Sequence, residues 1–327
     1  MTSANASHWP VHRFPAPLEH DVLAEAQDLL RAAEAADGTP TVSEQSVIAL
    51  RTGGNPGQQV SVHALFAPED PFTEEDKPLE SLLAGFAVLV GEGGESVLEM
   101  AVHPSYRNLG AGLRLAQDVL DARGTLDGVQ AWSHGDSAAA EDLARHFGLS
   151  KARELWRMRL STPAAATADD DALPAGYTIR TFVPGQDEEA WLAANAEVFA
   201  SHPEQGALTL NDLQERLAEP WFDPAGFFLA VDAEDRIAGF HWTKMHPALP
   251  GHAAHGEVYV VGVLPHAQGK GLGKVLTRHG VKHLLSRGAS TVVLYTEADN
   301  APAVRLYEGL GFTHWDSDVM YRKNPAD

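Results

Sequence analysis

The sequence contains no cysteine, which excludes a disulfide framework, a thiolate zinc site and a cysteine nucleophile. It has no apolar run of about 18 residues, and its first residues, MTSANASHWPVHRF, hold no apolar core typical of a signal peptide. Basic residues are scarce, because 24 Lys and Arg stand against 45 Asp and Glu, a formal net charge of −21 at pH 7. Such a charge repels nucleic acids and anionic membranes, so neither is an expected partner. We expect a soluble, cytoplasmic, monomeric protein.

The length and composition predict a globular chain of two domains. The sequence has 327 residues, 44% of them hydrophobic and 21% charged. The segment 161–174, STPAAATADDDALP, combines small residues, prolines and three consecutive aspartates. Because this composition buries little apolar surface, it is typical of a linker. We therefore expect domains at 1–160 and 175–327, joined by a linker at 161–174.

The two halves also resemble each other, which indicates an internal duplication. Matching segments recur in the same order: AGF at 84–86 and 238–240, VHP at 102–104 and VLP at 263–265, RNLGAG at 107–112 and QGKGLG at 268–273, VQAW at 129–132 and VVLY at 292–295, and HFGL at 146–149 and GLGF at 309–312. Each half begins with a helical pattern (18–35 and 188–199), continues with strands, and then alternates helix and strand. The order predicts two homologous α/β domains, each an α+β mixed sheet with helices on both faces.

The segment Gln268–Gly273 lies between a β-branched strand and a helical stretch at 274–285. Glycines there allow a sharp turn that directs several backbone amides, and the positive end of the helix, toward one point. That arrangement suits a pyrophosphate, and a tight strand-to-helix turn is the alternative. The pattern is neither a dinucleotide fingerprint nor a P-loop. From 258 to 296 there is no Asp or Glu, while Lys270, Lys274, Arg278, Lys282 and Arg287 form a basic island.

This repeated loop, followed by Asn300, Ala303, Tyr307, Gly311 and Phe312 at characteristic spacing, resembles the GCN5-related N-acetyltransferase (GNAT) family. The resemblance covers nearly the whole chain and implies two tandem GNAT domains that use acetyl-CoA as co-substrate, without a metal. The longer matches HPEQG (202–206), WFDP (221–224), GFHWTK (239–244) and GEVYV (256–260) are similar to a tandem-domain branch of the family. That branch acetylates the cysteinyl amine of cysteinyl-glucosaminyl-inositol.

The resemblance also implies which residues contact acetyl-CoA. In the second domain these are Val261, Gly262 and Val263 along the pantetheine arm, Gln268, Gly269, Lys270, Gly271, Leu272, Gly273 and Lys274 around the pyrophosphate, and Asn300, Ala301, Pro302, Ala303, Val304 and Arg305 near the thiol. Their counterparts in the first domain are Met100, Ala101 and Val102, and Asn108, Leu109, Gly110, Ala111, Gly112 and Leu113.

Acetyl transfer to an amine needs a base for the ammonium and an acid for the leaving thiolate. Glu257 heads the strand that leads to the glycine loop, so it is the candidate base, and an exposed strand-end carboxylate is the alternative. Tyr307 follows Asn300 by two helical turns and is the candidate acid, the alternative being a core aromatic.

The duplication offers an internal control for these two assignments. Counting residues between the repeats places Ala144 opposite Tyr307, Ser137 opposite Asn300 and Ser96 opposite Glu257. The first domain is therefore predicted to keep a glycine loop but to be degenerate and non-catalytic.

The acceptor is expected to be a small hydroxyl-rich amine held between the domains. The residues that the resemblance implies for it are Glu44, Glu204, Lys244, Glu257 and Tyr295, whose carboxylates, lysine and phenol suit sugar hydroxyls and an ammonium. A zinc site at His241, His246, His252 and His255 is the less favoured interpretation, since these residues flank a Pro/Gly loop without HExxH spacing and look like surface histidines. A non-catalytic acyl-CoA sensor, and acetylation of an aminoglycoside or a protein N-terminus, remain alternatives.

Overall fold

The computed structural model describes residues 5–68, 83–135, 137–161, 172–200, 203–248 and 253–324. The chain divides into two compact units: unit 1 comprises Met1–Glu154 and Ser317–Asp327, and unit 2 comprises Leu155–Asp316. The division falls within a strand, whereas residues 162–171 of the expected linker lie outside the described residues. None of the helices within the described ranges has the length and apolarity needed to cross a membrane.

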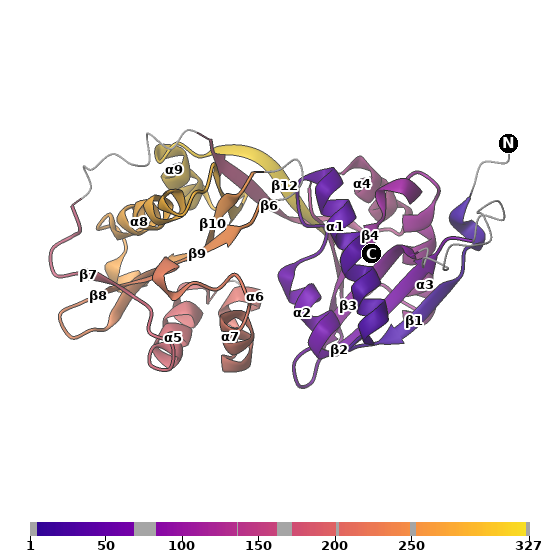
Figure 1. Ribbon diagram of the computed structural model, residues 1–327, viewed down its shortest axis with the longest axis horizontal. Coiled ribbons are helices and arrows are strands. Elements are labelled where there is room, and N and C mark those ends of the chain that lie inside the picture. The colour runs from indigo at the N-terminus through magenta and orange to yellow at the C-terminus, as the bar shows by residue number, and fades with distance from the viewer. Residues whose placement is uncertain are drawn as a thin grey trace. The chain divides into compact units, whose positions relative to one another are not determined.

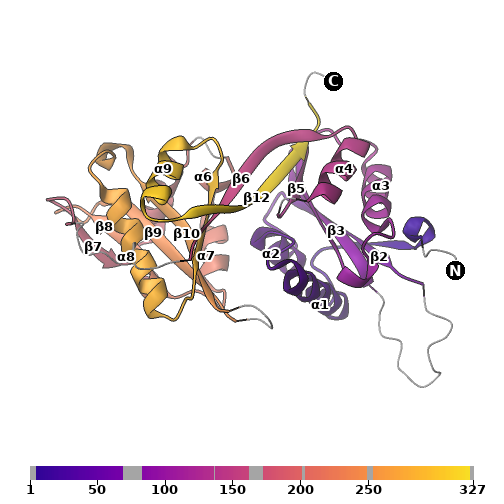
Figure 2. The same cartoon turned by 90° about the horizontal axis from the view of Figure 1, so that it is seen from above.

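Unit 1 is a mixed sheet covered by helices on both faces. Its strand order is β1-β2-β3-β4-β5-β12. The strands are β1 (Val11–Pro15), β2 (Gln59–Phe66), β3 (Leu83–Glu92), β4 (Glu95–Val102), β5 (Val129–Ser133) and the second half of β12 (Thr313–Arg322). The helices are η1 (Ala6–His8), α1 (His20–Asp37), α2 (Glu44–Thr52), η2 (Pro104–Tyr106), α3 (Ala111–Arg123) and α4 (Ala138–His146). Helices α1 and α2 cover one face of the sheet, and α3 and α4 cover the other (Figure 2).

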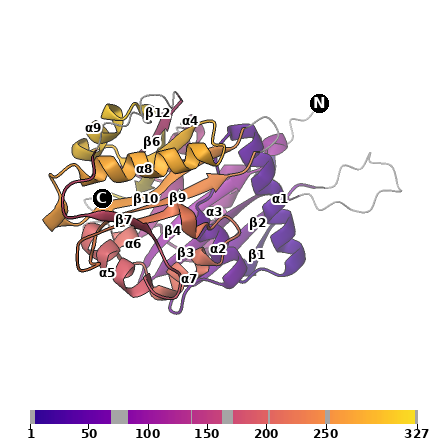
Figure 3. The same ribbon diagram turned by 60° about the vertical axis from the view of Figure 1, so that its left-hand side comes forward.

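Unit 2 repeats this plan with the strand order β6-β11-β10-β9-β8-β7. Its strands are β6 (Ser150–Leu160), β7 (Thr178–Thr181), β8 (Phe227–Val231), β9 (Ile237–His246), β10 (His255–Val263) and β11 (Val292–Glu297). Its helices are α5 (Glu188–Val198), α6 (Pro203–Gly206), α7 (Leu210–Leu217), η4 (Pro224–Gly226), η5 (Pro265–Ala267), α8 (Leu272–Ser286) and α9 (Ala301–Gly309). Helices α8 and α9 cover one face and α5 to α7 the other (Figure 1), and α8 lies along β9 and β10 (Figure 3). The predicted α/β fold with a mixed sheet is confirmed.

Close backbone packing explains why both halves contain the segment AGF. A Cβ on Gly85 would lie 2.8 Å from the carbonyl oxygen of Ala101 and 3.1 Å from a methyl of Leu115. A Cβ on Gly239 would lie 2.9 Å from the carbonyl oxygen of Gly262 and 2.9 Å from a methyl of Leu276. The same helix therefore presses against the same strand in each unit, and the two repeats can be compared residue by residue.

One β-bulge shifts that comparison in the strand that carries Glu257. The pairing of β9 with β10 changes register between Val258 and Val260, so Tyr259 is an extra residue, whereas β3 and β4 pair without a shift. Ser96 and Gly256 then occupy the same position, each bonding to the strand that follows α3 or α8. The residue opposite Glu257 is therefore Val97, and the count that gave Ser96 is wrong by the one bulged residue.

Each unit receives its sixth strand from the other half of the sequence. Strand β6 follows the first repeat but pairs with β11 in unit 2, with Leu160 opposite Val292. Strand β12 ends the second repeat, yet Val319 pairs with Ser133 of β5 in unit 1. The hydrophobicity pattern of the sequence contains no indication of this exchange.

Candidate active site

The glycine loop of unit 2 has the backbone that was expected of an anion site. Gly269 and Gly271 have φ of 74° and 84°, a region that favours glycine. Gly271 is the N-cap of α8, whose first amides lack acceptors within the helix. No protein atom lies within 4 Å of the Cβ position of either glycine, so this side of the loop is open. The loop can therefore present several amides to a pyrophosphate.

The loop of unit 1 has the same shape with different side chains. Gly110 caps α3 with φ 87°, and Asn108 takes the left-handed conformation at φ 62° in the position of Gly269. Arg107 Nε donates to the carbonyl of Val102 at 3.2 Å, just as Gln268 Nε2 donates to Val263 at 3.0 Å. The Arg107 guanidinium also pairs with both carboxylate oxygens of Asp37, at 2.6 and 2.8 Å.

A gap between strands lies beside the loop of unit 2. Strand β10 pairs with β11 from Gly256 to Val258 and with β9 as far as Val263. Within the described residues, the β11 side of Val260–Val263 therefore has no paired strand. Such an edge offers amides and carbonyls to an extended ligand, which is what a pantetheine arm requires. In unit 1, β4 pairs with β5 from Ser96 to Glu99.

Glu257 lies in the paired part of β10, three residues before this free edge, and is not an exposed carboxylate. Its side chain is 13% exposed, and its Oε2 lies 2.6 Å from His246 Nε2. Burial acts to raise the pKa of Glu257, but the hydrogen bond from His246 and the nearby positive charge of Lys244 help to lower it overall. Glu257 is therefore an ionised carboxylate whose Oε2 contacts the imidazole ring of His246.

Sequence reasoning missed His246 and His255 as parts of this site. Their rings stack at 4.4 Å, and they lie opposite each other across β9 and β10. Burial lowers the pKa of His255 to about 4, and positive charge nearby adds to this, so His255 is neutral at pH 7. A β-hairpin whose loop follows His246 would place His246 opposite His255. The hydrophobicity pattern of the sequence does not show where the two strands end, so it could not reveal this pairing.

The three described histidines of this group lie in strands β9 and β10 and not in a surface loop, which corrects the sequence interpretation for them. His241 is fully buried in β9, with Nδ1 2.8 Å from the carbonyl oxygen of Leu276, and burial lowers its pKa to about 4. His252 lies outside the described residues. Among the residues that the structure describes, no three His, Asp or Glu side chains are grouped as metal ligands would be.

Tyr307 reaches the strands from the opposite face. It is 7% exposed and packs in one cluster with Val258, Leu294 and Phe312, next to Val261. Burial raises the pKa of Tyr307 to about 12, so the phenol keeps its proton at neutral pH. Glu257 lies beside Lys244 on the face covered by α5 to α7. Asn300 is the N-cap of α9, accepting from the amide of Ala303 at 3.2 Å.

The other residues expected to hold the acceptor are placed as follows. The Lys244 ammonium lies 4.3 Å from the Trp221 ring centroid and 5.2 Å from that of Tyr259, a cation–π arrangement that the sequence did not reveal. Tyr295 is 37% exposed, and the Arg157 guanidinium lies 5.9 Å from its ring. Glu204 belongs to α6, and its side chain is outside the described residues. Glu44 is the first residue of α2 in unit 1.

The equivalent position in unit 1 holds alanine in place of tyrosine. Ser137 caps α4 as Asn300 caps α9, and Ala144 occupies the position of Tyr307. A small cavity of about 60 Å³, lined by Ala144, Met100, Trp132 and Tyr321 among others, lies at this position. The small alanine side chain thus leaves a void next to Tyr321 of β12.

Known proteins with similar sequences and folds identify the family of this chain. A model of the acetyltransferase (GNAT) family matches residues 190–312, all of which lie in unit 2. A mycothiol acetyltransferase of Pseudarthrobacter chlorophenolicus is 54% identical to this chain over 98% of both chains, and one of Arthrobacter sp. strain FB24 is 53% identical over 98% of both.

The chain belongs to the GNAT acetyltransferase family.

A solved tandem GNAT protein from the clavulanic acid pathway has a TM-score of 0.71 to this structure at 18% identity, covering 97% of this chain and 100% of that one. This likeness shows the tandem fold. As a family member with relatives of such identity, the chain is an acetyl-CoA-dependent acetyltransferase. The glycine loop and the free edge of β10 fit the phosphates and the pantetheine arm of that co-substrate.

Proposed function

We propose that this protein transfers the acetyl group of acetyl-CoA to the cysteinyl amine of cysteinyl-glucosaminyl-inositol (desacetylmycothiol), the last step of mycothiol biosynthesis. The observation that carries the proposal is identity above 50% to mycothiol acetyltransferases along essentially the full length of both chains. The geometry of unit 2 supports the proposal, because the glycine loop, the free edge of β10, Glu257 and Tyr307 all belong to one compact unit.

In this proposal Glu257 removes the proton from the acceptor ammonium, directly or through one water. An α-ammonium has a pKa of roughly 7.7–8, so a modest base is sufficient near neutral pH. Glu257 is ionised, and the hydrogen bond at 2.6 Å from His246 holds its carboxylate in one orientation. The neutral amine then attacks the thioester carbon, so the C–N bond forms and the C–S bond breaks. The nitrogen loses one further proton as it becomes an amide, and through solvent this proton restores the phenol of Tyr307 after the phenol has protonated the leaving thiolate.

Tyr307 donates a proton to the leaving thiolate. Its pKa of about 12 keeps the phenol protonated until the thiolate develops. The phenol lies on the opposite face from Glu257, so the base and the acid approach the reacting group from different sides of the sheet. Acetyl transfer then needs no metal, and acetyl-CoA is consumed as a co-substrate.

In this proposal Lys244, Tyr295 and Glu204 of unit 2 hold the acceptor. The resemblance to the GNAT family adds Glu44 of unit 1 to this set. A polyol with one amine suits such polar groups, and a site built around hydroxyls rejects analogues that lack them by up to ~10⁴–10⁵. Free cysteine carries the same amine and thiol without the hydroxyls, so it should be a very poor acceptor.

The test is a thiol-release assay with acetyl-CoA and a panel of amines. The proposal expects kcat/KM for the pseudodisaccharide conjugate to exceed that for free cysteine by at least ~10³. Comparable values for the two acceptors would overturn the acceptor assignment while leaving acetyl transfer intact. A higher kcat/KM for an aminoglycoside or a peptide N-terminus would assign that compound as the acceptor instead. Absence of turnover with every amine of the panel would favour a non-catalytic acyl-CoA sensor.

A further inference from the structure

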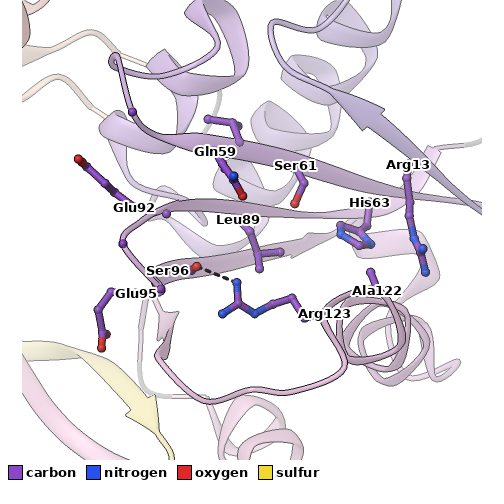
Figure 4. Close-up of a pocket in the computed structure, with 15 residues that line it drawn as sticks. Arg13, Gln59, Ser61, His63, Leu89, Glu92, Glu95, Ser96, Ala122 and Arg123 are labelled. Carbon is purple, nitrogen blue, oxygen red and sulfur yellow. Dashed lines mark hydrogen bonds between the residues drawn. The ribbon is translucent and has the colours of Figure 1, made fainter.

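A hollow of about 470 Å³ lies in unit 1, between strand β2, the β3–β4 hairpin and the end of α3 (Figure 4). Its volume is in the range of sites that hold small metabolites. It is lined at the end of α3 by Ala122 and Arg123, whereas the glycine loop of unit 1 lies at the start of that helix. The hollow is thus separate from the loop expected to bind a cofactor.

A buried histidine with one nitrogen lacking a partner lines this hollow. His63 is 2% exposed, and its Nδ1 lies 2.8 Å from Asp118 Oδ2. Burial acts to raise the pKa of Asp118, but its hydrogen bonds with Arg13 and His63 lower it, so the carboxylate is ionised and bonds to Nδ1. Within the described residues His63 Nε2 has no hydrogen-bond partner. This second ring nitrogen is therefore left for a hydrogen bond with a ligand in the hollow.

The hollow also contains a guanidinium that no carboxylate neutralises. Arg123 donates to Ser96 Oγ at 3.0 Å and to the carbonyl oxygens of Thr125 and Asp127 at 3.3 Å, and it forms no ion pair with any residue in the described part of the chain. Figure 4 shows Gln59 and Ser61 pointing toward Arg123 from β2, while Glu92 and Glu95 point away from it. In a chain with a net charge of −21, an uncompensated arginine in a polar hollow is a site for an anion.

Unit 2 shows that the fold does not require these polar groups. The positions of His63 and Asp118 are taken by Phe228 and His279, whose rings contact each other at 4.5 Å. The positions of Ser96 and Arg123 are taken by Gly256 and Leu284, and a Cβ on Gly256 would lie 2.8 Å from Leu284 Cβ. In unit 2, side chains thus occupy the space that forms the polar hollow in unit 1.

We propose that the hollow of unit 1 binds a small hydroxyl-rich phosphate ester of sugar-phosphate size. The phosphate lies against Arg123 and Ser96, because this is where positive charge is not neutralised. The hydroxyls form hydrogen bonds with His63 Nε2, Ser61 and Gln59. A bare phosphate would leave most of the volume and the histidine nitrogen unused, which is why an ester with a polyol body is favoured.

The experiment is a titration of the full chain, saturated with acetyl-CoA so that the glycine loops are occupied, followed by backbone amide NMR. Glucose 6-phosphate is the probe, with glucose and inorganic phosphate as separate arms. The expected result is saturable shifts at residues 59–63 and 91–96 with glucose 6-phosphate, and weaker binding of either fragment. Absence of shifts there up to about 10 mM, or shifts confined to residues 268–274, overturns the proposal.

Two variants and a matched control sharpen the result. Arg123→Gln should weaken glucose 6-phosphate at least about tenfold, as expected for loss of a charged hydrogen-bond donor. Arg145→Gln removes an exposed arginine of the same unit, on α4, and should not change the affinity. Ser61→Phe fills the hollow from an exposed strand position and serves if Arg123→Gln does not fold. Unchanged affinity in a folded Arg123→Gln or Ser61→Phe protein contradicts the site.

Discussion

The two units place their buried charges at different positions of one frame. In unit 2 the buried carboxylate is Glu257, which lies next to the point where β10 stops pairing with β11 and contacts His246. In unit 1 Val97 occupies the position of Glu257. The buried carboxylate there is Glu99, which is 1% exposed and bonds to His134 at 2.6 Å. His134 in turn bonds to Asp318 of β12 at 2.9 Å. The comparison teaches that the duplicated fold keeps its glycine loop while its buried carboxylate changes place, beside a free strand edge in unit 2 and within a hydrogen-bonded network in unit 1.

The pair that packs the main helix on the sheet also differs between the units. In unit 2 a Cβ on Gly280 would lie 2.2 Å from the ring of His241, so the glycine makes room for the histidine. In unit 1 the same two positions hold Val119 and Ala87, both fully buried. Large and small residues have exchanged places across the interface, which conserves volume.

The largest effect is expected on turnover, from the residues that only unit 2 has. Glu257→Gln removes a base and Tyr307→Phe removes a proton donor, and each should lower kcat by ~10²–10⁴. Glu95→Gln and Tyr106→Phe remove the same groups from unit 1 and should leave kcat unchanged. The measurement is steady-state kinetics on variants shown to be folded. Wild-type kcat in both unit 2 variants would assign the chemistry to other residues.

The next effect concerns the stability of unit 1. Burial acts to lower the pKa of His134, but hydrogen bonds to Asp318 and Glu99 and their charges raise it to about 10. Removing this cation with His134→Gln leaves the buried carboxylates of Glu99 and Asp318 without their cationic partner, and should cost about 3–5 kcal/mol of unfolding free energy. Urea unfolding measures this loss of unfolding free energy. Arg145→Gln is the control, and its unfolding free energy is expected within about 0.5 kcal/mol of wild type. A change below about 1 kcal/mol would show that the network is not stabilising.

The same network predicts a pH dependence of defined sign. Because the pKa of His134 is about 10 in the folded unit and about 6.5 when unfolded, the folded state holds an extra proton between these values. Its contribution is complete below about pH 6.5 and is lost as the pH rises toward about 10. The stability difference between wild type and His134→Gln should therefore be larger at pH 6 than at pH 9.5. A difference that grows with pH would contradict the assignment.

A smaller effect tests the packing comparison. Gly280→Ala forces a methyl group against His241 and should cost about 1–3 kcal/mol of unfolding free energy. Adding His241→Ala restores the room, so the double variant should be more stable than the sum of the single variants predicts. Thermal or urea unfolding of the four proteins of this cycle measures the coupling. Strictly additive effects would mean that the two residues do not share the space.

The smallest effect separates the two glycine loops. Gly271→Ala and Gly110→Ala place a side chain at φ 84° and 87°, each with a strain of roughly 1–2 kcal/mol. The loss of stability should be similar for both. The KM for acetyl-CoA should rise about fivefold to tenfold for Gly271→Ala only, since roughly 1 kcal/mol of strain at the working loop corresponds to that factor. An equal rise for Gly110→Ala would assign a working cofactor site to unit 1 as well.

Much of the architecture and of the candidate site in unit 2 was determined by the sequence itself. Glycines at 269 and 271, the cap at Asn300 and the repeated AGF segments act through local backbone conformation and close packing, which short patterns encode. The tertiary structure decided what depends on pairing between distant strands. The bulge at Tyr259, the contact of His246 with Glu257 and the polar hollow around His63 arise where separate elements meet. The exchange of β6 and β12 also belongs here, because a strand's own alternation fixes which face is buried and not which sheet edge it joins.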